Sequence, residues 1–299
     1  MLESSRVAVP PPPRRATRVS WAWLGALPFF GFLAAFLLWP TLAIAVQSFV
    51  DQQGRPTLQN LIDLSRPVVL TSYWYTIQIS IASSLLGALL GFLLAYAITI
   101  GALPKGLRNA LISFCGVASN FAGVPLAFAF IATLGQLGIV TRALRDLGIM
   151  LYPTFSLYGF WGLTLTYTYF QIPLMVLIMV PALDSLRREW REAAESLGAN
   201  AMQFWRYIAL PILTPALLST FILLFGNAFG AHATAFALTG GGAQGQVITI
   251  LIGAQMSGDS LSNPGIGNAM AFGMIVIMGL TILLYTWLQR RSERWLRPS

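Results

Sequence analysis

The sequence predicts an all-α integral membrane protein with six transmembrane helices. Of its 299 residues, 56% are hydrophobic and only 9% are charged, whereas soluble domains carry about 25% charged residues. So few charges cannot cover a water-exposed surface, which indicates a membrane environment. The charged residues also leave six gaps of at least 30 residues, and a membrane-crossing helix needs only about 20 apolar residues. These gaps are 21–50, 67–104, 109–141, 147–183, 207–258 and 260–289.

Each gap predicts one span. The first apolar run continues past Trp39 to Val46, which is too long for the apolar core of a cleaved signal peptide, so we expect an uncleaved span. The gap at 207–258 is the longest. It contains the glycine-rich stretch 239–245, which disfavours a helix, so we expect one span and then a loop. The predicted spans run over 22–46, 70–98, 110–134, 158–181, 214–238 and 267–288.

The charges predict the orientation of the chain. We expect a tail at 1–20, a membrane domain at 21–289 and a second tail at 290–299, and six spans place both tails on one side. Fourteen of the 18 Lys and Arg residues fall on that side, which the positive-inside rule assigns to the cytoplasm. The fourteen are Arg6, Arg14, Arg15, Arg18, Lys105, Arg108, Arg187, Arg188, Arg191, Arg206, Arg290, Arg291, Arg294 and Arg297.

The composition argues against several classes of function. The predicted spans contain no charged residue, although proton relays and ion-coupled transporters usually place one at membrane depth. A single histidine, His232, and a single cysteine, Cys115, exclude a two-histidine metal site and a disulfide framework within this chain. The only lysine, Lys105, does not follow a phosphate-binding glycine loop. The net charge of +8 fits membrane lipids better than nucleic acid, because no basic stripe with interleaved aromatic residues occurs.

The predicted cytoplasmic loop at 184–211 is the most distinctive stretch. Apolar residues recur at every third or fourth position over 186–208 and indicate one helical stripe. We expect Gly198 to divide it into two short helices joined by a tight turn, and Pro211 to suit the first turn of the next span. Periodicity alone leaves two interpretations open, a helix on the lipid surface or a docking element for a groove on another protein. The opposite side carries the charged residues Arg188, Glu192 and Glu195.

The same loop carries a spaced pattern of residues. Glu192-Ala193-Ala194 is followed by Gly198, and after nine more residues by Ile208, Leu210 and Pro211. In residue types and in spacing, this pattern resembles the loop signature of permease subunits of binding-protein-dependent ABC importers of the type I fold. Short segments at 123–125, 151–155 and 238–241 make the chain most similar to the polyamine, phosphonate, thiamine and iron group of that family.

The resemblance implies a permease that forms the path for a small solute, a polyamine or a related organic solute, in a bacterial inner membrane. It also implies that the loop forms a coupling helix, between the fourth and fifth spans, that docks on a cytoplasmic ATPase subunit. This chain itself is expected to be no enzyme and to bind no cofactor, with ATP and Mg²⁺ on the partner ATPase. The expected contact residues are Arg191, Glu192, Ala193, Ala194, Ser196, Leu197, Gly198, Ala199, Ile208, Leu210 and Pro211.

Two further partners are implied by the resemblance. One is a second permease subunit, expected to be a different chain. The other is an extracytoplasmic solute-binding protein, which would dock on the outer loops at 51–66, 135–157 and 239–266. Uptake rather than export follows from the loop signature, which belongs to importers.

Polar residues of the predicted fifth span are candidates for lining the transport path. Thr220, Asn227 and Thr234 are seven residues apart and would share one helix face, and His232 lies nearby. The alternative is that these side chains form hydrogen bonds with neighbouring helices. We interpret two pairs of glycines four residues apart as positions of close helix packing. These pairs are Gly87 with Gly91 and Gly226 with Gly230.

Three other classes of protein fit the sequence less well. An ATP-independent channel or secondary transporter does not account for the pattern at 192–211, and the predicted spans offer no charge for coupling. A membrane enzyme would need clustered histidines, cysteines or carboxylates at membrane depth. A structural scaffold fits the composition but does not require the loop pattern.

Overall fold

The computed structural model describes residues 25–51, 53–101, 103–241, 247–257 and 263–296, with side chains described up to residue 287. The predicted tail at 1–20 lies outside the described residues, as do the end of the tail at 290–299 and parts of the predicted loop at 239–266. The described ranges contain helices, turns and one isolated β-bridge, between Val50 and Pro56, and no β-strand. The predicted all-α class is therefore confirmed.

The chain divides into two compact units, residues 1–43 and 44–299. In the first unit, α1 (Leu27–Leu33) passes through a π-helical turn into α2 (Trp39–Gln47), whose last residues belong to the second unit. Six helical segments of the described chain are long and apolar enough to cross a membrane, which confirms the predicted number. They are Leu27–Gln47, Pro67–Ile100, Val124–Asp146, Phe160–Asp184, Ala201–Phe229 and Pro264–Trp287.

The third predicted span, 110–134, is wrong as a single helix. The chain instead forms α5 (Lys105–Ala118), a break, and α6 (Val124–Leu134), which is followed by α7 (Ile139–Asp146). Gly123 causes the break because its φ of +71° lies in the left-handed region that favours glycine. Pro125 follows in the first turn of α6, where its missing N–H needs no partner.

The fifth predicted span, 214–238, is displaced. The continuous helical run covers Ala201–Phe229 and consists of α10 (Ala201–Phe204), a π-helical turn (Trp205–Ala209) and α11 (Leu210–Phe229). Pro211 lies in the first turn of α11 as expected, and the helical turn before it agrees with the helical stripe predicted over 186–208. Gly230 ends α11, and two separate short helices follow. They are α12 (Ala233–Thr239) and α13 (Ile248–Met256).

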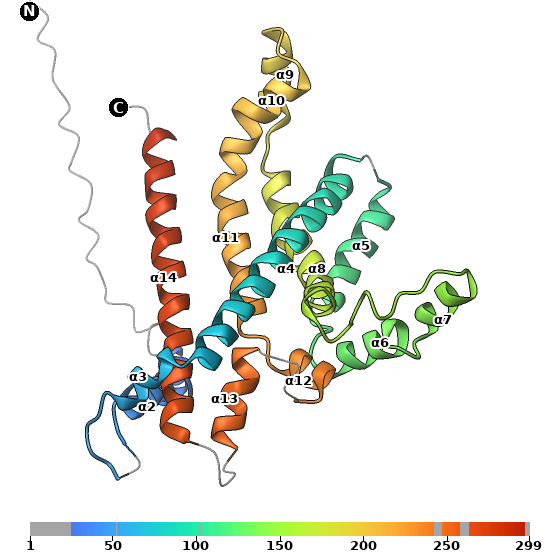
Figure 1. Cartoon of the computed structure of the whole chain (residues 1–299). Coiled ribbons are helices and arrows are strands. Elements are labelled where there is room, and N and C mark those ends of the chain that lie inside the picture. The colour runs from blue at the N-terminus through green and yellow to red at the C-terminus, as the bar shows by residue number, and fades with distance from the viewer. Residues whose placement is uncertain (1–24, 52, 102, 242–246, 258–262, 297–299) are drawn as a thin grey trace, which may run out of the picture. The chain divides into compact units, whose positions relative to one another are not determined.

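The second unit is built on the contact between α4 (Pro67–Ile100) and α8 (Phe160–Asp184), with α11 packed on both (Figure 1). Gly87 and Gly91 allow this approach, because an added Cβ would lie 2.6 Å from Gln171 Cβ and 2.5 Å from Met175 Cβ. Gly226 likewise faces α14 (Pro264–Leu296). The predicted packing role is therefore confirmed for these three glycines, whereas Gly230 serves as the C-cap of α11.

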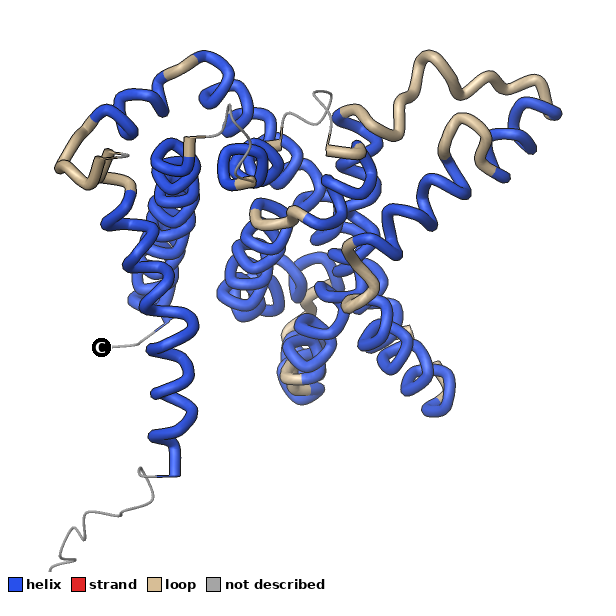
Figure 2. The backbone as a smooth tube through the Cα atoms, turned by 90° about the horizontal axis from the view of Figure 1, so that it is seen from below, coloured by secondary structure: helices blue, strands red, loops and turns tan. Residues whose placement is uncertain are grey.

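The shorter helices lie at the margins of this core. Two views show α6 and α7 extending away from the α4–α8 pair (Figures 1 and 2). Helix α6 contacts α12, which follows the break after α11. The short helix α3 (Gln59–Ile62) and a 3₁₀ turn (Asp63–Ser65) contact α14. The membrane-spanning pattern is therefore interrupted twice, by the break before α6 and by the break after α11. The two breaks lie close together, because α6 contacts α12.

Candidate functional site

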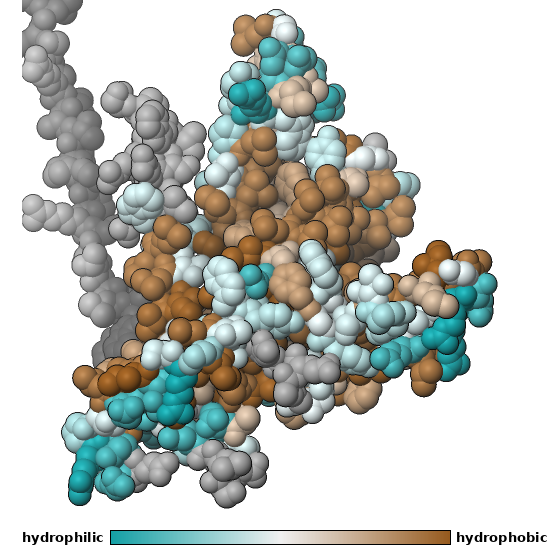
Figure 3. All heavy atoms as spheres, in the orientation of Figure 1, coloured by the Kyte–Doolittle hydropathy of each residue, from teal (hydrophilic) through white to brown (hydrophobic). Residues whose placement is uncertain are grey.

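The loop pattern at 184–211 forms a helical segment that projects beyond the ends of α4 and α8 (Figure 1). After α8 ends at Asp184, a short linker leads into α9 (Arg188–Ser196), and a turn at 197–200 leads into α10. The expected division into two short helices is confirmed. Most of the segment's surface is hydrophilic, in contrast to the apolar helices below it (Figure 3).

Gly198 forms the turn between the two helices. Its φ is +80°, and the backbone around it closes a Schellman turn. The Ala199 N–H donates to the Ala194 carbonyl (3.0 Å), and the Gly198 N–H donates to the Glu195 carbonyl (3.0 Å). Asn200 then starts α10 with a capping box, in which its side chain and that of Gln203 satisfy each other's backbone N–H.

The structure divides the predicted apolar stripe in two. Ala194 and Phe204 are buried with Ala209 in a small cluster, because the turn folds α10 back against α9. Leu197 remains 88% exposed, and Trp190 remains 37% exposed. A hydrophobic patch lies at the tip of the segment in the surface view (Figure 3). Only part of the stripe is therefore free to meet a partner.

The predicted contact residues fall into three groups by exposure. The exposed residues lie on the surface of the segment and at the start of α11. One of the predicted contact residues is buried. Exposed are Arg191, Glu192, Ala193, Ser196, Leu197, Gly198 and Leu210, half-buried are Ala199, Ile208 and Pro211, and buried is Ala194.

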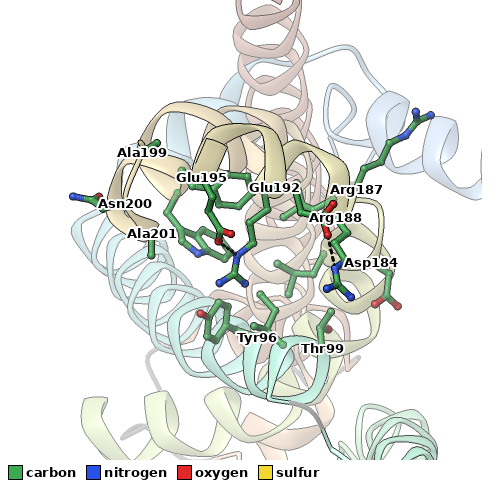
Figure 4. A pocket seen from close by; sticks show the side chains of 16 residues that line it. Tyr96, Thr99, Asp184, Arg187, Arg188, Glu192, Glu195, Ala199, Asn200 and Ala201 are labelled. Atoms are coloured by element: carbon green, nitrogen blue, oxygen red, sulfur yellow. Dashed lines mark hydrogen bonds and ion pairs between the residues drawn. The ribbon is translucent and has the colours of Figure 1, made fainter. Parts of the chain in front are cut away.

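The charged side of α9 borders a cavity of about 700 Å³ (Figure 4). Arg188 Nε donates to Glu192 Oε1 (2.9 Å), and Arg191 Nε donates to Glu195 Oε1 (2.9 Å). These exposed pairs, four residues apart, contribute about 0.3–0.5 kcal/mol each. The wall opposite α9 comes from the end of α4, which sequence reasoning did not connect with this loop.

A second hollow, of about 320 Å³, gathers three of the four predicted path residues. Asn227 comes from α11, His232 from the break after it, and Thr234 from α12. The expectation that Thr220, Asn227 and Thr234 share one helix face is wrong, because α11 ends at Phe229. Thr220 does not line this hollow. It is 1% exposed, and its hydroxyl donates to the Ala216 carbonyl of its own helix (2.7 Å).

Contacts between distant parts of the chain hold the hollow together. The Gly123 N–H donates to Thr234 Oγ1 (2.8 Å), which joins the break before α6 to the start of α12. The Tyr167 hydroxyl of α8 donates to the Ala231 carbonyl (3.0 Å). Gly123 and Phe170 also line the hollow, and sequence reasoning did not place them there. The Gly-Val-Pro sequence at 123–125 was the available signal, since it marks a helix break.

No metal centre is found among the described residues, where no group of three or more His, Cys, Asp or Glu could hold an ion. The projecting segment offers an apolar tip and charged sides. The hollow offers an amide, an imidazole and a hydroxyl between broken helices.

Comparison with known proteins gives consistent matches. Residues 87–298 match the family described as "Binding-protein-dependent transport system inner membrane component". The spermidine/putrescine transport system permease protein PotB of Haemophilus influenzae is 25% identical over 264 residues, which cover 86% of this chain and 90% of that protein. The thiamine transport system permease protein ThiP of Escherichia coli is 28% identical over 217 residues, which cover 72% of this chain and 38% of that protein.

A solved structure shares the fold. A chain of the bacterial ABC transporter involved in the import of the acidic polysaccharide alginate superimposes with a TM-score of 0.71. The two sequences are 18% identical, and the match covers 90% of this chain and 95% of that one. The overall fold of this chain is thus one that is known from a solved structure.

Proposed function

The chain belongs to the family of binding-protein-dependent transport system inner membrane components, and from this we propose that its α9–α10 segment docks on an ATPase subunit. The chain is the membrane permease of an ABC importer, and ATP hydrolysis belongs to a separate subunit. It is a multi-pass protein of the inner membrane that works with ATPase subunits and a solute-binding protein.

The exposure of Leu197 carries the docking proposal. Leu197, Trp190 and Ala193 lie on one side of α9, and we call them the docking surface. An 88% exposed leucine at the tip of a hydrophilic segment gains free energy when it is buried, about 1.5–3 kcal/mol for a full side chain. The tip points away from the apolar helices (Figure 3). This geometry favours a protein groove over the lipid surface as its partner.

One continuous helix links the docking surface to the hollow. The run Ala201–Phe229 starts beside the turn at Gly198 and carries Asn227 near its other end. At 1.5 Å per residue, it spans roughly 40 Å. A displacement of the α9–α10 segment by an ATPase subunit would therefore move one wall of the hollow, as in a rigid-body transition.

We propose that Asn227, His232 and Thr234 face the solute, whereas the burial and bonding of Thr220 support a packing role. PotB and ThiP are named for spermidine/putrescine and for thiamine. By that likeness we propose a small organic solute, polyamines included. Among the described residues, none that lines the hollow is a carboxylate, so selectivity would reside mainly in the solute-binding protein or in a second, different permease chain. Both termini would be cytoplasmic.

The docking proposal can be tested by co-expressing the chain with candidate ATPase subunits of ABC importers. Leu197→Asp places a charge on the docking surface without disturbing a buried contact. We expect at least about tenfold weaker capture of the ATPase, as for an interface hot spot. Leu147→Asp is the matched control. Leu147 is 76% exposed and also directly precedes a glycine turn, after α7. Equal capture by wild type and both variants would contradict the proposal.

A further inference from the structure

The cavity beside α9 lies on the side opposite the docking surface. Arg188, Arg191, Glu192 and Glu195 recur at three- and four-residue spacing and line it from α9. The end of α4 forms the facing wall (Figure 4). Docking of an ATPase on the docking surface therefore leaves this cavity unexplained.

The cavity presents hydrogen-bond donors that no acceptor of the described residues engages. Arg188 and Arg191 each use Nε for a glutamate, and within the described part of the chain their terminal Nη groups have no partner. The buried Thr99 hydroxyl is also unpartnered within the described residues. A guanidinium with a free fork matches the oxygens of a phosphate group.

Among the described residues, one arginine of the lining has no carboxylate partner and is available to an anion. The two glutamates balance Arg188 and Arg191, and Asp184 is paired with Arg108. Arg187 remains as an additional cation of the lining, stacked over Trp190 at 5.8 Å. The three arginines and three carboxylates of the described lining sum to zero, but Asp184 is engaged by Arg108 from outside the lining, so Arg187 is the one charge of the lining without an ion-pair partner among the described residues.

Apart from Thr99 and Asn200, the remaining walls are apolar, and they include the ends of two spans. The Tyr96 and Trp205 rings meet edge to face with centroids 5.3 Å apart, and Ile100 and Leu183 continue the surface. Helices α4 and α8 end here, at Ile100 and Asp184. Aromatic rings and arginines at the end of membrane helices are typical of the headgroup region, where basic pockets between helices bind anionic lipids.

We propose that this cavity binds a phosphate group, supplied by an anionic phospholipid of the adjacent leaflet. The phosphate accepts hydrogen bonds from Arg188 and Arg191, and the glycerol backbone lies against Tyr96 and Trp205. The bound headgroup then bridges α9 to the end of α4 and sets the angle at which the docking surface is presented.

Native mass spectrometry of the purified full chain tests this site. The protein is mixed with phosphatidylglycerol or with phosphatidylcholine, and retained lipid is counted. We expect preferential retention of phosphatidylglycerol, reduced about tenfold or more by the double variant Arg188→Gln/Arg191→Gln, because bonds between charged groups are lost. The matched control Arg142→Gln/Arg145→Gln removes the same charge from α7 and is expected to retain lipid like wild type.

Each outcome decides the proposal. Equal retention of both lipids, or equal loss in both double variants, overturns it. Competition by millimolar inorganic phosphate supports the phosphate site but assigns it to a soluble anion. If the α9 double variant does not fold, Thr99→Leu fills the cavity without changing charge and is expected to lower retention in the same way. Unchanged retention in that variant also overturns the site.

Discussion

Helix α7 and helix α9 end in the same kind of turn. A glycine with positive φ follows each helix, Gly148 at +82° and Gly198 at +80°, and two backbone N–H groups bond back to the last helical turn. Each turn also exposes the leucine just before its glycine, Leu147 at 76% and Leu197 at 88%. Judged by local structure alone, the two helices are equivalent.

The two helices differ in the stretch of chain that comes after the turn. After α9, Asn200 caps α10, and one helix then runs without interruption to Phe229 beside the hollow. After α7, residues 147–159 form turns and irregular chain before α8 begins. The chain that follows the turn at Gly198 therefore leads along one helix to the hollow, whereas the turn at Gly148 is connected to it only by the chain that precedes it, through α7 and α6. The long helix that follows the turn, and not turn chemistry, therefore singles out α9 for docking.

Ala194→Asp, a change in α9, should have the largest effect on the projecting segment and on ATPase capture. Ala194 is 5% exposed against Phe204 and Ala209, so a carboxylate there would cost on the order of 3 kcal/mol. We expect α9 and α10 to separate, with rapid proteolysis at 185–200 and loss of ATPase capture. The membrane core should persist, because local units can open independently.

Ala143→Asp is the control for that change, since Ala143 is exposed on α7. It should leave both proteolysis and capture unchanged. Resistance of the Ala194→Asp variant to proteolysis would mean that the small cluster does not hold the segment together.

Replacing the turn glycines gives an intermediate effect. Gly198→Ala and Gly148→Ala impose the same left-handed strain, about 1 kcal/mol each, and neither added Cβ meets an atom within 4 Å. We expect about fivefold weaker ATPase capture for Gly198→Ala and no change for Gly148→Ala, measured by titration. Equal weakening by both variants would show that the two turns contribute alike and would remove the distinction between α7 and α9.

The sequence reveals the projecting segment more fully than the hollow, for a physical reason. Gly198 and Asn200 act through neighbours within a few residues, so their roles follow from local rules. The hollow depends on a hydrogen bond between Gly123 and Thr234, which are 111 residues apart. Both lie beside helix breaks inside uncharged stretches, and the length of an apolar gap does not reveal where its helix stops. That is why two predicted spans were misplaced while their number was correct.

Thr234→Val should give the smallest effect. It should distinguish the role of the hollow from that of the docking surface at the other end of the long helix. The change removes the acceptor for the Gly123 N–H at nearly constant shape. Hydrogen bonds between membrane helices average about 0.6 kcal/mol, so we expect slightly lower thermal stability. Because the hollow loosens where Asn227 and His232 face it, solute uptake in proteoliposomes should fall while ATPase capture stays unchanged.

Thr239→Val is the matched control on the same helix. The Thr239 hydroxyl donates to Ala235, one turn back within α12, so its loss leaves no distant N–H without an acceptor. We expect normal uptake from this variant. Reduced uptake in both variants would mean that α12 tolerates no valine, and normal uptake in both would mean that the bond from Gly123 does not shape the path. A loss confined to Thr234→Val would tie transport to the hollow, independently of the docking surface at the other end of the helix.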